Sequence, residues 1–356
     1  MLIFYVNEKH HLDHIIDIYK AYKGEKSLFI PAKLTAYVED AEKVQAFDNN
    51  LKFKKTLNNL YKKYREDLKI LVAKYGSVSS LNAINTRYNL ILMEHGCGQY
   101  YDIRHYFWGR QHGLRKFMHS VKYMLCPNEC LANKIKKHNP KLKTYITGSP
   151  KLDRYTKQKT NNQRPLIVFS WHWECKVIPE TTGGFNYWKG CLIEIGKKYN
   201  IALHGHPRIQ RDVKIFARDN DIEHIESFDE VLVRADVYAC DNSSTLFEFA
   251  AIDKPVIVLN NPWFRKDIEQ GMRFWEYADI GVQCDDISDI EEAINKAIED
   301  KEHKRVEYVP KIYPYLGESV DRTIEVLNEI MQRGVIDFGE KKSVSKNIWE
   351  ANRKTT

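Results

Sequence analysis

The chain has 356 residues, of which 43% are hydrophobic, and a formal net charge of +7 from 55 basic and 48 acidic side chains. This length suits two domains of ordinary size, each with its own hydrophobic core. The charge is too mild to indicate nucleic-acid binding by itself, although it suits an acidic substrate or an anionic surface. No apolar run approaches the ~20 residues that span a bilayer, so any membrane contact has to be peripheral.

The seven cysteines are scattered and form no CxxC pair. This usage predicts reduced thiols and no structural zinc site. The first six residues resemble a short strand followed by charged residues, which is not the pattern of a signal peptide. We therefore expect a cytoplasmic protein, in contact at most with the inner face of the membrane, and no metal ligands.

The first half of the chain alternates short apolar runs with helical patterns. Strands are predicted at 2–6, 27–31, 70–73, 90–93, 123–126 and 144–147, and helices at 12–21, 41–68 and 131–137. This alternation is typical of an open parallel α/β sheet. The lysine-rich face of the second helix is either simply solvated or able to meet an anionic membrane.

The second half repeats the alternation after a polar segment, 158–164, that we interpret as a linker. Strands are predicted at 166–170, 201–203, 237–240, 256–259 and 280–283, and helices at 187–199, 213–218, 245–251, 287–299 and 320–331. The predicted fold class is α/β, with two Rossmann-like domains facing each other across a cleft. Their limits are 1–157 and 165–318, followed by a helix and a polar tail over 319–356. Ligands are expected at the carboxyl ends of the strands that face the cleft.

A polar turn follows the strand predicted at 237–240. Asp241, Ser243, Ser244 and Thr245 lie where the next helix begins. Backbone N–H groups and serine hydroxyls at a helix N-terminus can bind a phosphate or pyrophosphate. The alternative is that these residues only cap the helix, and the spacing of Thr245 and Glu248 matches a capping box.

His206 directly follows the strand predicted at 201–203 and is followed by a proline and by Arg208. Both His206 and Arg208 are suited to charge-assisted hydrogen bonds with a phosphate. His204 lies two residues earlier and, if the strand continues, points to the same side as His206. One histidine of this pair could instead be structural.

His95 and Gly96 follow the strand predicted at 90–93. A histidine at such a position can act as a general base toward a hydroxyl, because its pKa lies near the working pH. Gly96 permits close approach of a ligand or of another backbone. The alternative is that His95 caps a neighbouring loop.

Two further segments are candidates for lining the cleft. Gly148, Pro150 and Asp153 form a sharp turn at the end of the first domain, which could equally be only structural. His172 lies between two tryptophans that could stack on a base or line a pyrophosphate, or simply pack. The chain contains no P-loop, GxGxxG, HExxH or GxSxG motif.

The motifs HG (95–96), GSPKLD (148–153), HP (206–207) and DNSS (241–244) occur in a known order. This ordered set resembles the CDP-glycerol glycerophosphotransferase family, the primases and polymerases of wall teichoic acid. The resemblance covers roughly residues 90–259. It implies a GT-B fold, with an acceptor domain, a nucleotide-donor domain and a C-terminal helix that crosses back.

The resemblance also implies a reaction. An acceptor hydroxyl, on a lipid-linked or polymeric substrate, attacks the β-phosphate of CDP-glycerol, and CMP leaves. It implies His95 as the general base, with His206, Ser243 and Ser244 on the donor pyrophosphate. Apart from this nucleotide-activated donor, no cofactor is expected.

Two alternatives remain open at this stage. One is a GT-B glycosyltransferase or epimerase that uses a nucleotide sugar, with Glu248 on the ribose hydroxyls. The other is a non-enzymatic protein that binds an anionic polymer, although the chain contains no recognised nucleic-acid module and we do not expect nucleic acid as the partner. The sequence gives no indication of the oligomeric state.

Overall fold

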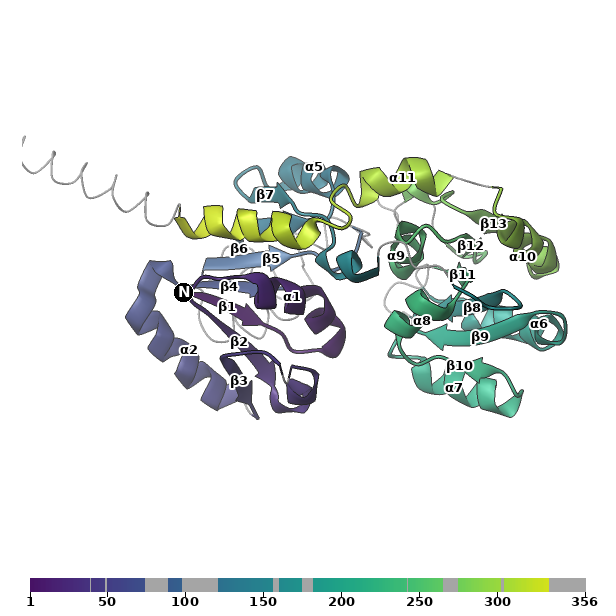
Figure 1. Ribbon diagram of the computed structural model, residues 1–356, viewed down its shortest axis with the longest axis horizontal. Helices are drawn as coiled ribbons and strands as arrows, with labels where there is room; N and C mark the ends of the chain where they lie inside the picture. Colours follow the sequence, from purple (N-terminus) through teal and green to yellow (C-terminus); the bar gives the residue numbers. More distant parts are fainter. Residues whose placement is uncertain are drawn as a thin grey trace, which may run out of the picture.

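The structure is a computed structural model. It describes residues 1–38, 40–48, 50–73, 89–97, 121–155, 160–174, 182–241, 243–264, 275–301 and 304–332. The described residues form two parallel α/β sheets, each with its own helices, side by side along the long axis of the molecule (Figure 1). The predicted fold class is therefore confirmed. The linker predicted at 158–164 is described only from residue 160, and the tail at 341–356 lies outside the described residues.

The first sheet has seven strands in the order β3-β2-β1-β4-β5-β6-β7, all paired in parallel. Its central strands are almost entirely apolar and buried along their whole length, as expected for a parallel sheet. The strands are β1 (Leu2–Tyr5), β2 (Lys26–Pro31), β3 (Val44–Phe47), β4 (Lys69–Val72), β5 (Asn89–Met93), β6 (Val121–Cys126) and β7 (Lys143–Ile146). The helical elements are α1 (Lys9–Ala21), η1 (Ala32–Tyr37), α2 (Asn50–Tyr64), η2 (Arg65–Asp67), α5 (Glu129–His138) and η4 (Pro150–Tyr155).

The second sheet has six parallel strands in the order β10-β9-β8-β11-β12-β13. The strands are β8 (Leu166–Trp171), β9 (Asn200–Gly205), β10 (Glu223–His224), β11 (Val237–Cys240), β12 (Val256–Leu259) and β13 (Val282–Cys284). The helical elements are α6 (Phe185–Lys198), α7 (Gln210–Asp219), α8 (Phe228–Arg234), α9 (Thr245–Ala251), η6 (Trp275–Tyr277), η7 (Ile287–Asp289), α10 (Ile290–Glu299) and α11 (Lys304–Ile312).

One predicted element is wrong in part. The helix expected over 41–68 is divided into the edge strand β3, the helix α2 and the short η2. The side chains of β3 are only half-buried or exposed, and the strand gains its order from parallel pairing with β2. Pairing of this kind is a tertiary effect that composition does not reveal.

The final helix, residues 319–332, returns from the second domain and packs along the first (Figure 1). Val326, Leu327 and Ile330 are buried in the core cluster formed by β1, α1 and their neighbours. The predicted crossing back of the C-terminal helix is confirmed.

The GSPKLD segment anchors this helix. The Asp153 carboxylate accepts hydrogen bonds from the backbone N–H groups of Gly317 and Val320, at 2.9 and 2.8 Å. Gly148 has a φ of +72°, and a Cβ on it would lie 2.3 Å from the Ser319 Oγ. The turn that we considered as a lining of the cleft therefore caps and contacts the crossover helix.

The two domains share a core cluster. Cys97, Leu152 and Tyr155 of the first domain are buried among residues of β8, β11 and α9. Asn128 adds hydrogen bonds from its side-chain amide to the carbonyl oxygens of Cys97, 2.8 Å, and Ile312, 3.1 Å. Within the described residues, no helix is both long and apolar enough to cross a bilayer.

Candidate functional site

Both sheets have a topological switch point beside their first strand, because β1 lies between β2 and β4 and β8 lies between β9 and β11. In open α/β sheets, ligands bind outside the carboxyl ends of the strands at such a point. In the second sheet, His172 follows β8 and Asp241 follows β11. In the first sheet, His95 follows β5, two strands from β1.

The segment that carries the predicted base approaches the predicted phosphate turn across the two domains. A Cβ placed on Gly96 would lie 3.3 Å from both the Cβ and the Oγ of Ser244. Gly96 therefore lets the HG segment of one domain approach the serine turn of the other. Gly96 and Ser244 are 148 positions apart along the chain, but they lie close together in the fold.

His95 is partly exposed and lies beside a carboxylate. Its Nδ1 is 3.2 Å from Oε1 of Glu94, and its backbone N–H donates to the same oxygen at 3.0 Å. The His95 side chain is 37% exposed and that of Glu94 only 11%. A carboxylate in this position can fix the ring and stabilise the imidazolium that forms when the ring accepts a proton.

Asp241 is fully buried and engaged within the protein. One carboxylate oxygen accepts the backbone N–H of His172 at 2.8 Å, and the other accepts that of Gly184 at 2.7 Å and the Asn261 amide at 3.4 Å. Asp241 therefore ties together the segments that follow β8, β11 and β12. This geometry favours a positioning role over direct contact with a phosphate.

The serine turn has its own hydrogen-bond network. The Ser243 Oγ accepts hydrogen bonds from the Thr245 hydroxyl, 2.8 Å, and from its backbone N–H, 3.3 Å. Ser244 is the N-cap of α9, a helix of seven residues, and its side chain makes no cap bond. The capping box predicted for Thr245 and Glu248 is therefore wrong, because the cap lies one residue earlier and Glu248 has another partner.

That partner is Lys151, which the sequence did not single out. Its Nζ lies 2.9 Å from Oε2 of Glu248, and both side chains are less than 10% exposed. The pair joins η4 of the first domain to α9 of the second. Attraction to Glu248 and Asp229 outweighs burial and raises the pKa of Lys151, so the lysine stays charged.

The remaining aromatic and basic candidates cluster after β8 and β9. The ring centroids of His172 and His206 are 5.3 Å apart, and the Arg208 guanidinium lies 4.3 Å from the centre of the Trp173 ring. Nδ1 of His206 accepts the backbone N–H of Arg208 at 3.2 Å. A neutral His206 therefore carries its proton on Nε2, where it can donate to a ligand.

The family model described as CDP-Glycerol:Poly(glycerophosphate) glycerophosphotransferase matches residues 188–313. The predicted resemblance to this family is confirmed. The matched residues include two of the four motifs, the HP that follows β9 and the DNSS that precedes α9. No protein of curated function matches the chain.

Solved structures share the fold at low sequence identity. The wall teichoic acid polymerase TagF, in a structure with CDPG, has 12% identity and a TM-score of 0.62 over 94% of this chain and 89% of that chain. MnaA of S. aureus, with UDP, has 14% identity and a TM-score of 0.65 over 93% and 96%. The UDP-GlcNAc 2-epimerase of Neisseria meningitidis has 13% identity and a TM-score of 0.57 over 92% and 100%. Together with the glycerophosphotransferase match, these GT-B neighbours support a transferase that uses a nucleotide-activated donor.

His204 differs from His206 in its surroundings. It is buried, and its Nδ1 lies 2.8 Å from the Ser170 Oγ. Burial, with a smaller effect of the nearby His224 and Lys151, lowers the pKa of His204 from 6.5 to about 3. His204 is therefore a neutral, buried ring that is hydrogen-bonded within the protein, whereas His206 is partly exposed. His204 therefore fits the structural alternative, and His206 remains the candidate residue for binding the nucleotide donor.

This difference predicts a pH dependence of stability. Between pH 6.5 and 3 the unfolded chain binds a proton at His204 that the folded chain excludes. The free energy of unfolding therefore falls as pH falls, by at most about 1.4 kcal/mol per pH unit from this one group. Urea titrations of His204→Gln between pH 6.5 and about 5 are expected to show a shallower slope than wild type. An unchanged slope in His204→Gln would refute the assignment.

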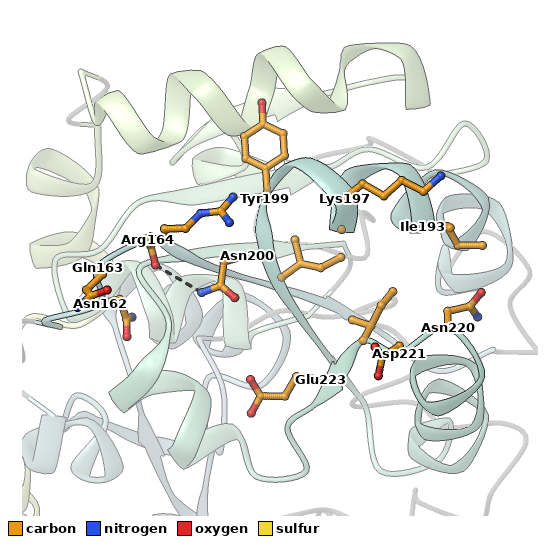
Figure 2. A pocket seen from close by; sticks show the side chains of 13 residues that line it. Asn162, Gln163, Arg164, Ile193, Lys197, Tyr199, Asn200, Asn220, Asp221 and Glu223 are labelled. Carbon is orange, nitrogen blue, oxygen red and sulfur yellow. Dashed lines mark hydrogen bonds between the residues drawn. The ribbon is translucent and has the colours of Figure 1, made fainter.

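One cavity lies away from these residues. It has a volume of about 760 Å³ and is lined by segments that precede or begin β8, β9 and β10, among them Arg164, Asn200 and Glu223 (Figure 2). These are the amino ends of the strands, opposite to the ends that hold ligands in this fold. The cavity is therefore not part of the candidate site.

Proposed function

We propose that this protein transfers a glycerophosphate group from a CDP-activated donor to an acceptor hydroxyl. The observation that carries the proposal is the close approach of Gly96 to Ser244, since it brings the segment of the candidate base near the candidate phosphate turn. The glycerophosphotransferase match over residues 188–313 supports the choice of the transferred group. The fold shared with TagF supports the use of a donor of the CDPG type.

In the proposed reaction the acceptor oxygen attacks the β-phosphorus of the donor. The new P–O bond forms as the bond to CMP breaks, and His95 accepts the acceptor's proton. Glu94, beside Nδ1 of His95, stabilises the resulting imidazolium. Because phosphoryl transfer depends mainly on positioning and on stabilising oxygen charge, hydrogen-bond donors are what the second domain has to supply.

Two side chains can supply such donors. Ser243 accepts two hydrogen bonds from Thr245, which leaves its own O–H to donate to a phosphate oxygen. Nε2 of His206 can donate in the same way, since Nδ1 accepts a backbone N–H. The pyrophosphate is proposed to lie between these two groups, on the His95 side of the serine turn.

Thermal unfolding with a panel of nucleotides tests the proposal. CDP-glycerol, CDP and CMP are expected to stabilise the protein, by about 2.7 kcal/mol at a hundred times the dissociation constant. His206→Ala and Ser243→Ala should lose much of this stabilisation, whereas Ser227→Ala, a serine at the start of α8, should keep it. Release of CMP from CDP-glycerol in the presence of a polymeric or lipid-linked acceptor then tests the transfer itself.

Other outcomes would decide against the proposal. Stabilisation by UDP or GDP compounds in preference to cytidine nucleotides would favour an enzyme acting on nucleotide sugars. No stabilisation by any nucleotide, together with salt-sensitive binding of an anionic polymer, would favour the non-enzymatic alternative.

A further inference from the structure

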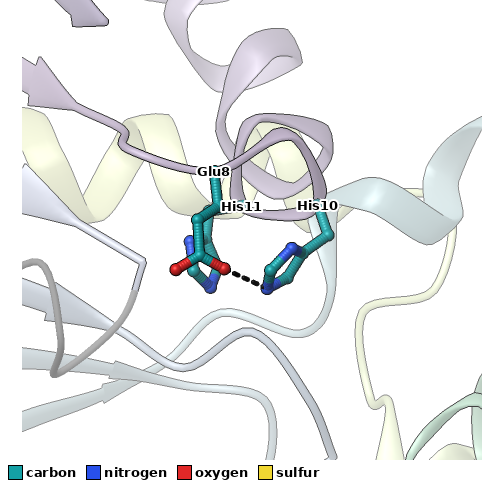
Figure 3. A group of neighbouring side chains, drawn as sticks. All are labelled: Glu8, His10 and His11. Atoms are coloured by element: carbon teal, nitrogen blue, oxygen red, sulfur yellow. Dashed lines mark ion pairs between the residues drawn. The ribbon is translucent and has the colours of Figure 1, made fainter. Parts of the chain in front are cut away.

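We propose that Glu8, His10 and His11 form a binding site for one divalent transition-metal ion of the Zn²⁺ type. The three residues lie at the start of α1 and each offers one ligand atom (Figure 3). These atoms all lie within 4.8 Å of one another. The proposal concerns binding and does not depend on the transferase activity.

The distances suit a tetrahedral ion. With metal–ligand bonds of about 2.0–2.2 Å, two ligand atoms of a tetrahedral site are separated by roughly 3.3–3.5 Å. Nε2 of His10 and Oε2 of Glu8 are already 3.4 Å apart. The imidazole rings of His10 and His11 pack with their centroids 3.9 Å apart. Rotations that move ligand atoms by about an ångström therefore complete the three-ligand set.

The local backbone explains how the Glu8 side chain reaches the two histidines of the first turn. Neighbouring residues inside a helix point in different directions. Here Glu8 is the N-cap, with an extended backbone at φ −137° and ψ 148°, so its side chain returns toward the first turn. The positive end of the α1 dipole opposes a cation at this place, and the Glu8 carboxylate offsets that effect.

The position in the fold is one where ligands bind. The three residues follow β1 at the switch point of the first sheet, and the His95 ring lies 5.2 Å from that of His11 and 6.4 Å from that of His10. His11 is only 1% exposed, whereas the side chains of Glu8 and His10 are 43% and 44% exposed. The buried His11 would hold the ion in a fixed position. The exposed Glu8 and His10 leave a path by which the ion can enter from solvent.

The ligand types select the class of metal. Two imidazoles and one carboxylate suit Zn²⁺, Ni²⁺ or Cu²⁺, whereas Mg²⁺ and Ca²⁺ prefer sets made of oxygen atoms. A set of two histidines and one glutamate is also a common composition for zinc sites that keep a fourth position for water.

Metal titration of the untagged full-length protein tests the site. Calorimetry with Zn²⁺ is expected to show one ion per chain, and Co²⁺ should give the intense visible absorption of a tetrahedral complex. Glu8→Gln and His10→Gln alter exposed side chains, so both variants are expected to fold. Each should weaken Zn²⁺ binding by at least about tenfold, since each removes one of three ligands.

His224→Gln is the matched control, because it removes a half-buried histidine in β10 of the other domain. Its Zn²⁺ affinity should equal that of the wild type. The proposal is overturned if the wild type binds no Zn²⁺, or if Glu8→Gln and His10→Gln bind it as tightly as the wild type. It is also overturned if His224→Gln loses affinity to the same extent, since the ion would then bind elsewhere.

Discussion

Replacing His95 by alanine is expected to lower the turnover number for glycerophosphate transfer by about 10²–10⁴-fold, the usual contribution of a general base. The affinity for the nucleotide should change little. His95 belongs to the first domain and is paired with Glu94, whereas the candidate donor ligands Ser243 and His206 belong to the second. The measurement is CMP release under saturating donor, combined with calorimetric binding of CMP to the same variant.

The control for this experiment is a variant of the donor side. His206→Ala is expected to weaken nucleotide binding and turnover together, because its Nε2 is proposed to contact the donor itself. Glu94→Gln keeps the ring of His95 but removes the neighbouring charge, so its loss of turnover should be smaller than that of His95→Ala. If His95→Ala lost nucleotide affinity as severely as His206→Ala, His95 would belong to the donor site and the assignment as base would fail.

The elements around the site were well predicted because their sequence signals are local. The strand at 237–240, the helix at 245–251 and the strand at 256–259 coincide with β11, α9 and β12. Each is a short apolar run bounded by residues that break regular structure. The edge strand β3 was missed because its order comes from pairing with β2. β10, of two residues, is too short to produce a periodic signal.

The sequence predicted which segments form the candidate site, but only part of the roles of their residues. The HG and DNSS motifs do meet, through Gly96 and Ser244. Asp241 and His204, however, are buried and satisfied within the protein, and burial depends on contacts that a linear motif does not contain. His204 lies in β9 and His206 follows its last residue, and only the burial of His204 against Ser170 separates a structural residue from a candidate ligand.

Lys151 and the cluster at Glu8 were missed for different reasons. Lys151 lies inside the GSPKLD motif, whose glycine and proline indicate only a turn. Its partner Glu248 is 97 residues away, and nothing local links the two. The cluster has a signal that could have been used, because three histidines fall within the five residues that begin at His10, just beyond a strand. Standard zinc patterns with histidines four apart on one helix face do not cover an N-cap glutamate with two adjacent histidines.

Replacing Lys151 by methionine is expected to lower the free energy of unfolding by about 3–5 kcal/mol, which makes it the largest stability effect predicted for a single side chain here. The change leaves the Glu248 carboxylate buried, 4% exposed, without its cation 2.9 Å away. The aliphatic part of methionine can still pack against Phe228, whose ring centre lies 4.9 Å from Nζ in the native protein. The loss of unfolding free energy should therefore reflect the unpaired charge of Glu248 and not a change in side-chain volume at position 151. Urea unfolding followed by tryptophan fluorescence measures it.

A double-mutant cycle separates the ion pair from other effects of the substitution. Adding Glu248→Gln to Lys151→Met removes the stranded charge, so the double variant is expected to recover much of the lost stability. The control is Lys311→Met, which breaks an exposed pair with Glu307 of even shorter distance, 2.6 Å. It should leave the free energy of unfolding nearly unchanged, because solvent screens exposed pairs. Equal losses in Lys151→Met and Lys311→Met would show that burial of the inter-domain pair has no special importance. Since Lys151 and Glu248 lie on different domains, a large loss with recovery in the double variant would instead mean that the docking of the domains depends on neutralising this one buried carboxylate.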